Sequence, residues 1–376
     1  MSKKIKIGVI FGGRSGEHEV SLVSAASVIK VLDKDKYQVV PIGITKEGKW
    51  LATGDPMKAL KSGKSRGITQ EAETIINPAK KGFLRTAKGT LVSVDVVFPV
   101  LHGTYGEDGA IQGLLEMANI PYIGSRVLGS SIGMDKVIQK QLLENEDLPI
   151  VKYISFCKHE WEEGSANILR RIEKELKYPL FVKPANMGSS VGISKAKNRK
   201  GLVKAIKEAL KYDSKILVEK GLENIREIEC GVLGNYHPEA SLPGEVIASG
   251  EFYDYNAKYV DGKTETIIPA KLSPALIDRI QDLSIKTFKI LNLCGMSRVD
   301  FFMTKPGRLH KPAKIYINEV NTIPGFTAIS MYPKLWEASS LPYRELLNKL
   351  VRLAFEKHKE KMNLLNSYIP KADWYK

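Results

Sequence analysis

The order of apolar runs in residues 3–45 constrains the fold of this chain more than any other feature. IKIGVIF is apolar enough for a buried strand, EVSLVSAASVIKVLD has the spacing of a helix, and YQVVPIGIT is a second strand. Because the two strands are joined through a helix, these residues predict a βαβ unit with parallel pairing. With the strand of residues 94–101 and the helix after it, we expect an open, doubly wound α/β layer that ends near Ser125.

The glycine-rich turn GGRSGEHEVS lies between the first strand and the helix, where many proteins bind a nucleotide phosphate. Glu17 and Glu19 stand at the start of that helix, whereas a phosphate site would favour positive charge there. Acidic residues in a first helical turn complement the helix dipole, which is a purely structural explanation for both. The chain has no GxGxxG motif, and its nearest match to a Walker loop, GITKEGKW at 43–50, is more typical of a hairpin turn.

Further compact units are expected after this layer, because 376 residues exceed a single ordinary core. Residues 128–220 alternate short helices and strands, which predicts a small α+β unit. Residues 221–376 alternate again and end in an amphipathic helix from Tyr343 to about Lys361. We therefore divide the chain into units 1–127, 128–220 and 221–376, and expect the polar residues 46–90 to be irregular.

The formal net charge of +15 raises the question of a nucleic-acid partner. The lysines are scattered along helical runs such as RRIEKELK and KAIKEALK, mostly with acidic residues between them, and no aromatic and basic motif of an RNA-binding module occurs. We therefore expect no nucleic-acid partner. A basic surface that attracts small anions explains the charge better.

The sequence predicts a cytoplasmic protein without a membrane partner. The best apolar run, VDVVFPVL at 94–101, has the length of a strand, and the basic N-terminus leads into GGRSGE instead of a signal-peptide cleavage pattern. The three cysteines lie far apart and have no CxxC spacing, so we expect reduced thiols at Cys157, Cys230 and Cys294.

A pair of apolar strands late in the chain carries the strongest indication of a metal site. SRVDFFM and KIYINEVN flank a turn, which predicts an antiparallel hairpin with Asp300 opposite Glu319, about 5 Å apart. Asn321 shares the face of Glu319, and Arg298 shares that of Asp300. Oxygen ligands of this kind suit Mg²⁺, which often shares its ligand shell with nucleotide phosphates. Two exposed carboxylates are the alternative, which the apolar strands around them disfavour.

Other charged residues are less specific by themselves. In FVKPANMGSSVGISK, Lys183 ends a buried strand and the Gly/Ser loop could cover a phosphate, although a plain β-hairpin explains the loop equally well. Glu219 and Lys220 end the strand of ILVEKGL, and Glu227 follows, in an order that would suit adenine and ribose contacts. Lys136 in IGMDK would by itself be read as a solvated lysine. The Tyr-rich loop EFYDYNAKY is long enough to act as a lid.

These segments together resemble the D-alanine–D-alanine ligases of the ATP-grasp superfamily. The resemblance rests on GGRSGEHEVS, LHGTYGEDG, MDK, FVKPANMGSSVG, VEKGL, FYDYNAKY, SRVDFF and INEVNTIPGFT, in that order along nearly the whole chain. It implies a three-domain ATP-grasp architecture, mixing α/β and α+β units, in which an N-terminal open α/β domain contributes to the first D-alanine site. It also implies a homodimer that makes D-alanyl-D-alanine for peptidoglycan precursor synthesis, through an acyl phosphate formed from ATP.

The resemblance assigns ATP and metal contacts to residues of the two later units. It implies that Lys136 and Lys183 contact the phosphates, that a lid lysine, Lys258, also reaches them, and that Glu227 contacts the ribose. The adenine region would be contacted by Glu219, Lys220 and Leu222. Two Mg²⁺ or Mn²⁺ ions would be held by Asp300, Glu319 and Asn321.

The resemblance also assigns the amino-acid sites. Glu17 would pair with the ammonium of the first D-alanine, near His102, which turns the glycine-rich turn into an amino-acid site. Arg298 and the backbone N–H of Gly325 would stabilise the oxyanion of the tetrahedral intermediate. The carboxylate of the second D-alanine would be received by Ser330 and Met331.

A lid residue bears on which product the resemblance implies. Ser189 and Tyr259 match residues that link Glu17 to the lid, and ester-forming relatives carry Phe or another residue at the position of Tyr259. We therefore expect an amide product. Another ATP-grasp ligase acting on a different amino acid, D-serine as second substrate, a nucleic-acid-binding protein and an inactive nucleotide sensor are the alternatives.

Overall fold

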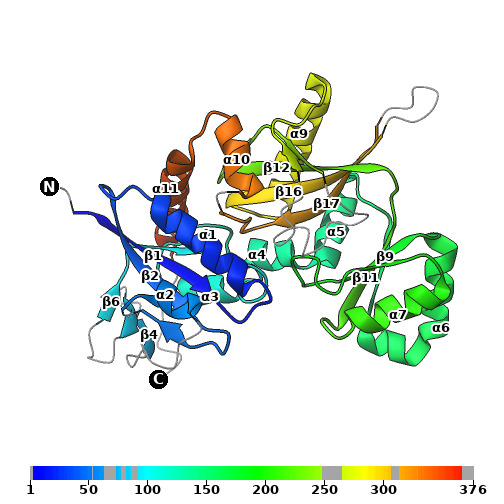
Figure 1. Cartoon of the computed structure of the whole chain (residues 1–376), viewed down its shortest axis with the longest axis horizontal. Helices are drawn as coiled ribbons and strands as arrows, with labels where there is room; N and C mark the ends of the chain where they lie inside the picture. The colour runs from blue at the N-terminus through cyan, green and yellow to red at the C-terminus, as the bar shows by residue number, and fades with distance from the viewer. Residues whose placement is uncertain are drawn as a thin grey trace, which may run out of the picture.

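The computed structural model describes residues 3–52, 54–62, 73–77, 82–85, 91–247, 265–305, 313–327 and 329–365. In this part of the chain the strands form four sheets, and Figure 1 shows how these sheets and the helices around them are arranged. None of the helices described there combines the length and the apolar character that crossing a membrane requires.

The N-terminal sheet confirms the predicted βαβ unit. Strand β1 (Ile5–Gly12) pairs in parallel with β2 (Tyr37–Ile44) and with β7 (Val96–Pro99), and helix α1 (His18–Val31) connects β1 to β2. Strand β3 (Trp50–Leu51) pairs antiparallel with β2, so GITKEGKW does form a hairpin turn. The sheet order is β3-β2-β1-β7, which places the carboxyl end of β1 at the centre of one sheet edge.

The prediction that residues 46–90 are irregular was wrong in part. Helix α2 (Pro56–Lys61) and strands β4 (Glu73–Asn77) and β5 (Gly82–Arg85) form within this segment, and β5 also pairs with β6 (Leu91–Ser93). These strands are short and lie between runs of Lys, Gly and Thr, so their apolar alternation is too brief to be recognised from sequence.

The middle lobe has a four-stranded antiparallel sheet with its own core. The sheet order is β10-β9-β11-β8, and helices α6 (Lys158–Glu175) and α7 (Arg199–Ala209) pack on it, as Figure 1 shows. Its strands are β8 (Tyr153–Cys157), β9 (Leu180–Pro184), β10 (Ser194–Ala196) and β11 (Lys215–Lys220). Strands β9 and β10 are antiparallel, so the Gly/Ser loop between them is indeed part of a hairpin-like connection.

The C-terminal lobe contains the largest sheet. Its order is β15-β14-β12-β16-β17, β13 pairs with β12, and helix α9 (Pro274–Ile290) contributes to the core on it. The strands are β12 (Ile225–Gly234), β13 (Glu239–Ala240), β14 (Gly244–Ile247), β15 (Glu265–Ile267), β16 (Gly295–Thr304) and β17 (Ile315–Asn321). Helices α4 (Val127–Met134) and α5 (Lys136–Asn145) lie between this lobe and the others (Figure 1).

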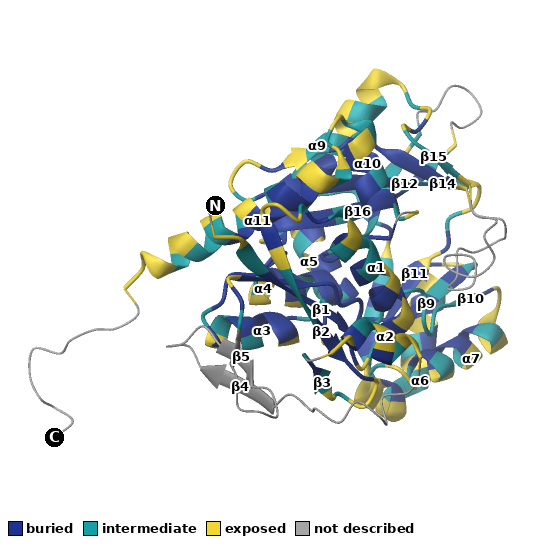
Figure 2. Cartoon of the chain, turned by 60° about the vertical axis from the view of Figure 1, so that its left-hand side comes forward, coloured by how far each residue is buried: buried dark blue, intermediate teal, exposed yellow. Residues whose placement is uncertain are grey.

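The N-terminal and C-terminal lobes share one hydrophobic core. Helices α10 (Met331–Ala338) and α11 (Tyr343–Met362) contribute buried side chains to the same cluster as β1 and β7, and the dark bands of Figure 2 follow these elements. Phe326 lies at the junction, with ring centroids 5.4 Å from Phe98 and 5.5 Å from Tyr332. The loop after β17 is therefore held against the N-terminal sheet. Residues of the N-terminal and C-terminal lobes thus meet at one site.

Candidate active site

The hairpin of β16 and β17 forms one wall of the site with the predicted pairing. Asp300 lies directly opposite Glu319, and Arg298 lies opposite Asn321. A bulge follows Asp300, where the register shifts before Phe301. Bulges twist a strand pair and redirect its side chains, so this one separates the polar end of the hairpin from its apolar stem.

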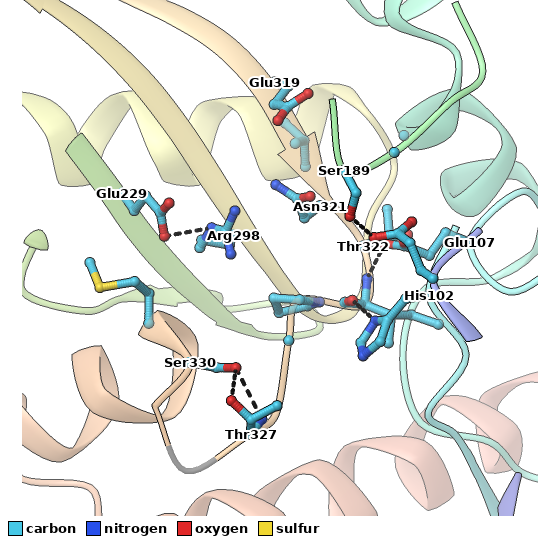
Figure 3. Close-up of a pocket in the computed structure, with 18 of the residues that line it drawn as sticks. His102, Glu107, Ser189, Glu229, Arg298, Glu319, Asn321, Thr322, Thr327 and Ser330 are labelled. Atoms are coloured by element: carbon cyan, nitrogen blue, oxygen red, sulfur yellow. Dashed lines mark hydrogen bonds and ion pairs between the residues drawn. The ribbon is translucent and has the colours of Figure 1, made fainter. Parts of the chain in front are cut away.

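Arg298 organises the polar end of this hairpin. Its Nε and Nη2 each donate to one carboxylate oxygen of Asp300 at 2.7 Å, and Nε also lies 2.9 Å from Oε2 of Glu229 on β12 (Figure 3). Asn321 Nδ2 donates to Oδ2 of Asp300 at 3.0 Å. Burial by itself would lower the pKa of Arg298, but the charges of Asp300 and Glu229 outweigh it and hold that pKa well above its usual value. The guanidinium therefore stays charged.

The hairpin carboxylates fit a divalent cation. Asp300 and Glu319 offer carboxylate oxygens from neighbouring strands, and Asn321 offers an amide oxygen beside them. Hard oxygen donors of this kind are what Mg²⁺ and Mn²⁺ prefer. Within the described ranges no group of three His, Cys, Asp or Glu side chains has the spacing of an all-protein metal cage. The donor set thus suits an ion that takes its other ligands from phosphate or water.

Two lysines bring positive charge toward the hairpin from the neighbouring elements. Lys136, the first residue of α5, donates to the backbone oxygen of Met187 at 2.7 Å, and its Nζ lies 3.7 Å from Oε2 of Glu319. Lys183, near the end of β9, donates to Oδ1 of Asn318 at 3.3 Å. Both residues were predicted from sequence, and both point from the middle part of the chain toward the C-terminal sheet.

Glu219 lies buried between two lysines. Its Oε2 is 2.5 Å from Nζ of Lys183, and its Oε1 is 2.6 Å from Nζ of Lys140. Burial would raise the pKa of Glu219, but the two lysines outweigh it and lower that pKa to about 2. Burial lowers the pKa of Lys140, an effect that Glu219 partly offsets. Lys140 was not predicted, although it lies one helical turn after Lys136.

Glu17 lies at the opposite wall, in the glycine-rich turn. Its side chain is 8% exposed and accepts a hydrogen bond from the hydroxyl of Ser189. A Cβ atom at Gly103 or at Gly188 would lie 2.5 Å from Oε2 of Glu17, so only glycine leaves room for the carboxylate at both positions. The Gly/Ser loop of the middle lobe therefore closes over an acidic group of the N-terminal lobe. Neither glycine was identified from sequence.

His102 is fixed from both sides of its ring. Nδ1 lies 3.1 Å from the backbone oxygen of Ile323, and Nε2 lies 2.9 Å from the hydroxyl of Ser24. Since a carbonyl oxygen only accepts, Nδ1 carries the proton and Nε2 accepts from Ser24. Burial lowers the pKa of His102, which keeps the ring neutral. The predicted residue is thus present in the site, where it holds the loop after β17.

Ser330 lies at the N-cap position of helix α10, but its side chain makes no hydrogen bond to the helix backbone. Its hydroxyl accepts from the backbone N–H of Thr327 at 3.0 Å and lies 2.7 Å from Oγ1 of Thr327, as Figure 3 shows. A Cβ atom at Gly325 would lie 2.9 Å from that hydroxyl, so the chain can pass close by only as glycine. A helix N-terminus with a hydroxyl beside it is a favourable place for a carboxylate.

Most of these groups line one cavity of about 340 Å³, large enough for small ligands such as amino acids. Its lining includes ten of the predicted residues, namely Glu17, His102, Lys136, Ser189, Arg298, Glu319, Asn321, Gly325, Ser330 and Met331. It also includes Glu107 and Glu229, which were not predicted. Glu107 lies in the polar loop HGTYGEDG, whose density of glycine and acid was an available signal.

Three predicted residues adjoin the cavity without lining it: Asp300 contacts the lining residue Arg298, and Lys183 pairs with Glu219. The other predicted residues lie elsewhere. Lys220 ends β11 on an exposed position, Leu222 follows it, and Glu227 lies on β12 opposite Val246 and Phe302. Lys258 and Tyr259 lie outside the described residues.

The comparison with family models decides which family this site belongs to. Residues 6–125 match the model described as D-ala D-ala ligase N-terminus, and residues 142–352 match D-ala D-ala ligase C-terminus. The chain belongs to the D-alanine–D-alanine ligase family. A D-alanine–D-alanine ligase of Caldicellulosiruptor bescii is 50% identical over 365 residues, which cover 96% of this chain and 98% of the relative.

Two solved structures place the family match on the whole fold. The D-alanine–D-alanine ligase of Coxiella burnetii has a TM-score of 0.81 at 37% identity and covers 96% of this chain and 97% of its own. The VanG D-Ala:D-Ser ligase of Enterococcus faecalis has a TM-score of 0.82 at 36% identity, with 94% and 100% covered. The ATP-grasp architecture expected of a D-alanine–D-alanine ligase is therefore confirmed.

Proposed function

We propose that this chain joins two D-alanine molecules to D-alanyl-D-alanine at the expense of ATP, and thereby supplies a peptidoglycan precursor. One observation carries the proposal: Glu17, Arg298 and the helix N-terminus at Ser330 line the same cavity. A carboxylate such as Glu17 can bind an ammonium group, and a helix N-terminus can bind a carboxylate. Two small amino acids with free charged ends fit such a cavity head to tail.

ATP binds between the middle and C-terminal lobes in this proposal. Lys136 and Lys183 contact its phosphates, Glu227 its ribose, and Lys258 reaches it from the lid, while the adenine region meets Glu219, Lys220 and Leu222. Asp300, Glu319 and Asn321 would hold two Mg²⁺ or Mn²⁺ ions. These ions would neutralise charge on the phosphates, as in other phosphoryl transfers.

The first step forms an acyl phosphate on the first D-alanine. Glu17 binds the ammonium group, and the loop of Ser189 keeps that carboxylate in place and excludes water. A carboxylate oxygen of D-alanine then attacks the γ-phosphorus, and the bond from that phosphorus to the bridging oxygen breaks to release ADP. Lys136 and Lys183 balance the charge on the transferring group, so positioning supplies most of the catalysis.

The second step forms the peptide bond. Ser330 and the backbone of Met331 hold the carboxylate of the second D-alanine, whose amine attacks the acyl carbonyl carbon. Arg298 and the N–H of Gly325 stabilise the resulting oxyanion. The bond from carbon to the phosphate oxygen then breaks, phosphate leaves, and the amine loses a proton. We further propose that the protein acts as a cytoplasmic homodimer.

ADP release tests the proposal. It should be stimulated strongly by D-alanine and weakly by L-alanine, and it should stop when the divalent ion is chelated. No stimulation by D-alanine would exclude this function. Because the structurally similar VanG is a D-Ala:D-Ser ligase, the same assay should also test D-serine as second substrate.

The amide product is tested separately. Because of Tyr259, D-alanine alone should support faster turnover at neutral pH than D-alanine with D-lactate as acceptor. A Tyr259→Phe change should shift the balance toward D-lactate, and an unchanged ratio would count against a role of Tyr259 in the lid.

A further inference from the structure

Glu107 connects two loops of the cavity, one from the N-terminal lobe and one from the C-terminal lobe. Its Oε2 accepts from the backbone N–H of Gly103 at 2.9 Å, and its Oε1 accepts from the backbone N–H of Ile323 at 3.0 Å. Gly103 follows His102 in the N-terminal lobe, and Ile323 lies in the loop after β17. One carboxylate thus bridges the N-terminal and C-terminal lobes inside the site (Figure 3).

The loop after β17 is held at both polar groups of Ile323. Glu107 accepts a hydrogen bond from the N–H of Ile323, and the ring of His102 donates one to its carbonyl oxygen at 3.1 Å. Pro324 follows, and its ring restricts φ to about −65°. The backbone between Ile323 and Gly325 therefore has few free dihedral angles, so the position of the Gly325 N–H depends on how Ile323 is held.

The other loop lies directly against the first amino-acid site. Gly103, which Glu107 fixes through its N–H, is so close to Glu17 that a Cβ atom would lie 2.5 Å from Oε2 of Glu17. Glu107 therefore sets the spacing between the carboxylate proposed to bind an ammonium group and the proposed oxyanion donor, Gly325.

The position of Glu107 is electrostatically unfavourable. Its enclosed environment and the charge of Glu17 raise the pKa of Glu107 to about 8, against the effect of its two backbone donors. Above pH 8 the group is a carboxylate whose two oxygens both accept, which matches the two N–H groups that meet them, so the bridge belongs to the charged form.

We propose that Glu107 is a positioning residue for the ligation, which holds the Gly103 loop and the Ile323–Gly325 segment in one arrangement so that the acyl carbonyl faces the Gly325 N–H. This inference rests on the proposed function. Without the bridge, the acyl phosphate still forms, but its carbonyl is poorly held during attack by the amine. Water then competes: it adds to the carbonyl carbon, the bond to the phosphate oxygen breaks, and D-alanine, phosphate and a proton are released.

The test is Glu107→Gln, which keeps the shape but offers only one acceptor for the two N–H groups. At a pH above 8, where Glu107 is a carboxylate, dipeptide turnover should fall by about tenfold to a hundredfold, the range for one lost charged hydrogen bond at a reacting centre. Phosphate released should exceed dipeptide formed, and the KM of the first D-alanine should rise, while the KM of ATP stays within about twofold. Asp108→Asn is the matched control, because the Asp108 side chain accepts from the nearby backbone N–H groups of Tyr105 and Ala110 and does not line the cavity.

The outcomes distinguish a positioning role of Glu107 in the reaction from a role in the stability of the fold alone. Wild-type turnover and equimolar phosphate and dipeptide in Glu107→Gln would overturn the inference, as would a loss of turnover that simply follows the loss of folded protein. If Glu107→Gln does not fold, Glu107→Asp decides, because it keeps the charge but is too short to reach both donors. Wild-type protein that D-alanine fails to stimulate would instead refute the proposed function.

Discussion

At the scale of single residues, Arg298 orders the polar end of the β16–β17 hairpin beside the cavity. Its Nε and Nη2 hold Asp300 in a fork, and Nε also pairs with Glu229. A guanidinium carries five N–H donors in a plane, so these contacts leave donors for a further oxygen. The same side chain can thus order the hairpin carboxylates and stabilise an oxyanion.

Arg298→Lys should lower kcat for dipeptide formation by about 10²- to 10³-fold, because one ammonium cannot replace the fork and the oxyanion donor together. The KM of ATP should change far less, and both are measured by steady-state kinetics. Arg226→Lys is the control, since Arg226 makes a similar fork with Glu245 at 2.7 and 2.6 Å but does not line the cavity. Equal losses in the two variants would contradict a special role of Arg298.

Glu219 should make stability depend on acid pH. Its folded pKa of about 2 lies below the ordinary value of 4.5, so its contribution is complete above pH 4.5 and is lost as pH falls toward 2. Between pH 4.5 and pH 2, the free energy of unfolding measured with urea should fall by on the order of 2–3 kcal/mol more for wild type than for Glu219→Gln. If the free energies of unfolding of the two proteins changed equally with pH, the ion pairs of Glu219 with Lys140 and Lys183 would not contribute to stability.

Lys140→Met should destabilise the protein by about 3 kcal/mol or less. Loss of one partner of a buried pair costs about 3–5 kcal/mol, but Lys183 remains beside Glu219 and offsets part of it. The KM of ATP should rise, because Glu219 would turn toward Lys183. The double variant Lys140→Met/Glu219→Gln should be less destabilised than the sum of the single variants, and strict additivity would show that the residues do not interact.

At the scale of elements, regular local patterns were predictable and contacts between lobes were not. The β16–β17 hairpin has two apolar strands around a turn, so its register followed from sequence, and Asp300 does lie opposite Glu319. The helix predicted from Tyr343 to about Lys361 ends at Met362. The contact of Glu107 with Ile323 joins residues 216 positions apart, and no local periodicity encodes it. Short elements such as β4 and β5 were missed for a related reason, since their stability depends on pairing.

Helix α11 is fastened to the N-terminal lobe near its end through Glu116. Glu116 accepts from the hydroxyl of Tyr122 at 2.8 Å, lies 2.8 Å from Nε of Arg126, and pairs with Lys361. Burial would raise the pKa of Glu116, but the bonds from Lys361 and Tyr122 outweigh it and keep that pKa below its usual value. The carboxylate therefore remains charged as the centre of this cluster.

Glu116→Gln should destabilise the protein more than Lys361→Met. The first change weakens three contacts of one carboxylate, for which we expect about 1–2 kcal/mol, whereas the second removes one partly exposed pair worth about 1 kcal/mol or less. Thermal unfolding at low and high salt measures both. A larger effect of Lys361→Met would show that the helix end depends on this pair alone.

At the scale of the whole molecule, one hydrophobic core crosses the boundary between the first and last units expected from sequence order, beside cores that stay within the first and the middle unit. The middle lobe has a core formed only by residues between Ile154 and Val218. The cluster of the N-terminal sheet instead includes Met296, Phe326, Tyr332 and other residues of the C-terminal part. The first and last lobes therefore share a hydrophobic core, whereas the middle lobe contributes Gly188 and Ser189 of its Gly/Ser loop to the wall of the cavity. A movement of the middle lobe would carry this part of the wall with it.

A fragment of residues 151–221 should therefore fold by itself, and a fragment of residues 1–127 should not. The first keeps every residue of its core, whereas the second loses the buried partners that α10 and α11 provide. Thermal unfolding followed by circular dichroism should be cooperative only for 151–221, and 1–127 should bind a hydrophobic dye and associate. A cooperative, monomeric 1–127 would mean that the shared core is an interface between two independent domains. In that case the spacing between Glu17 and Gly325 would depend on how two separate bodies dock, and the shared core would not fix it.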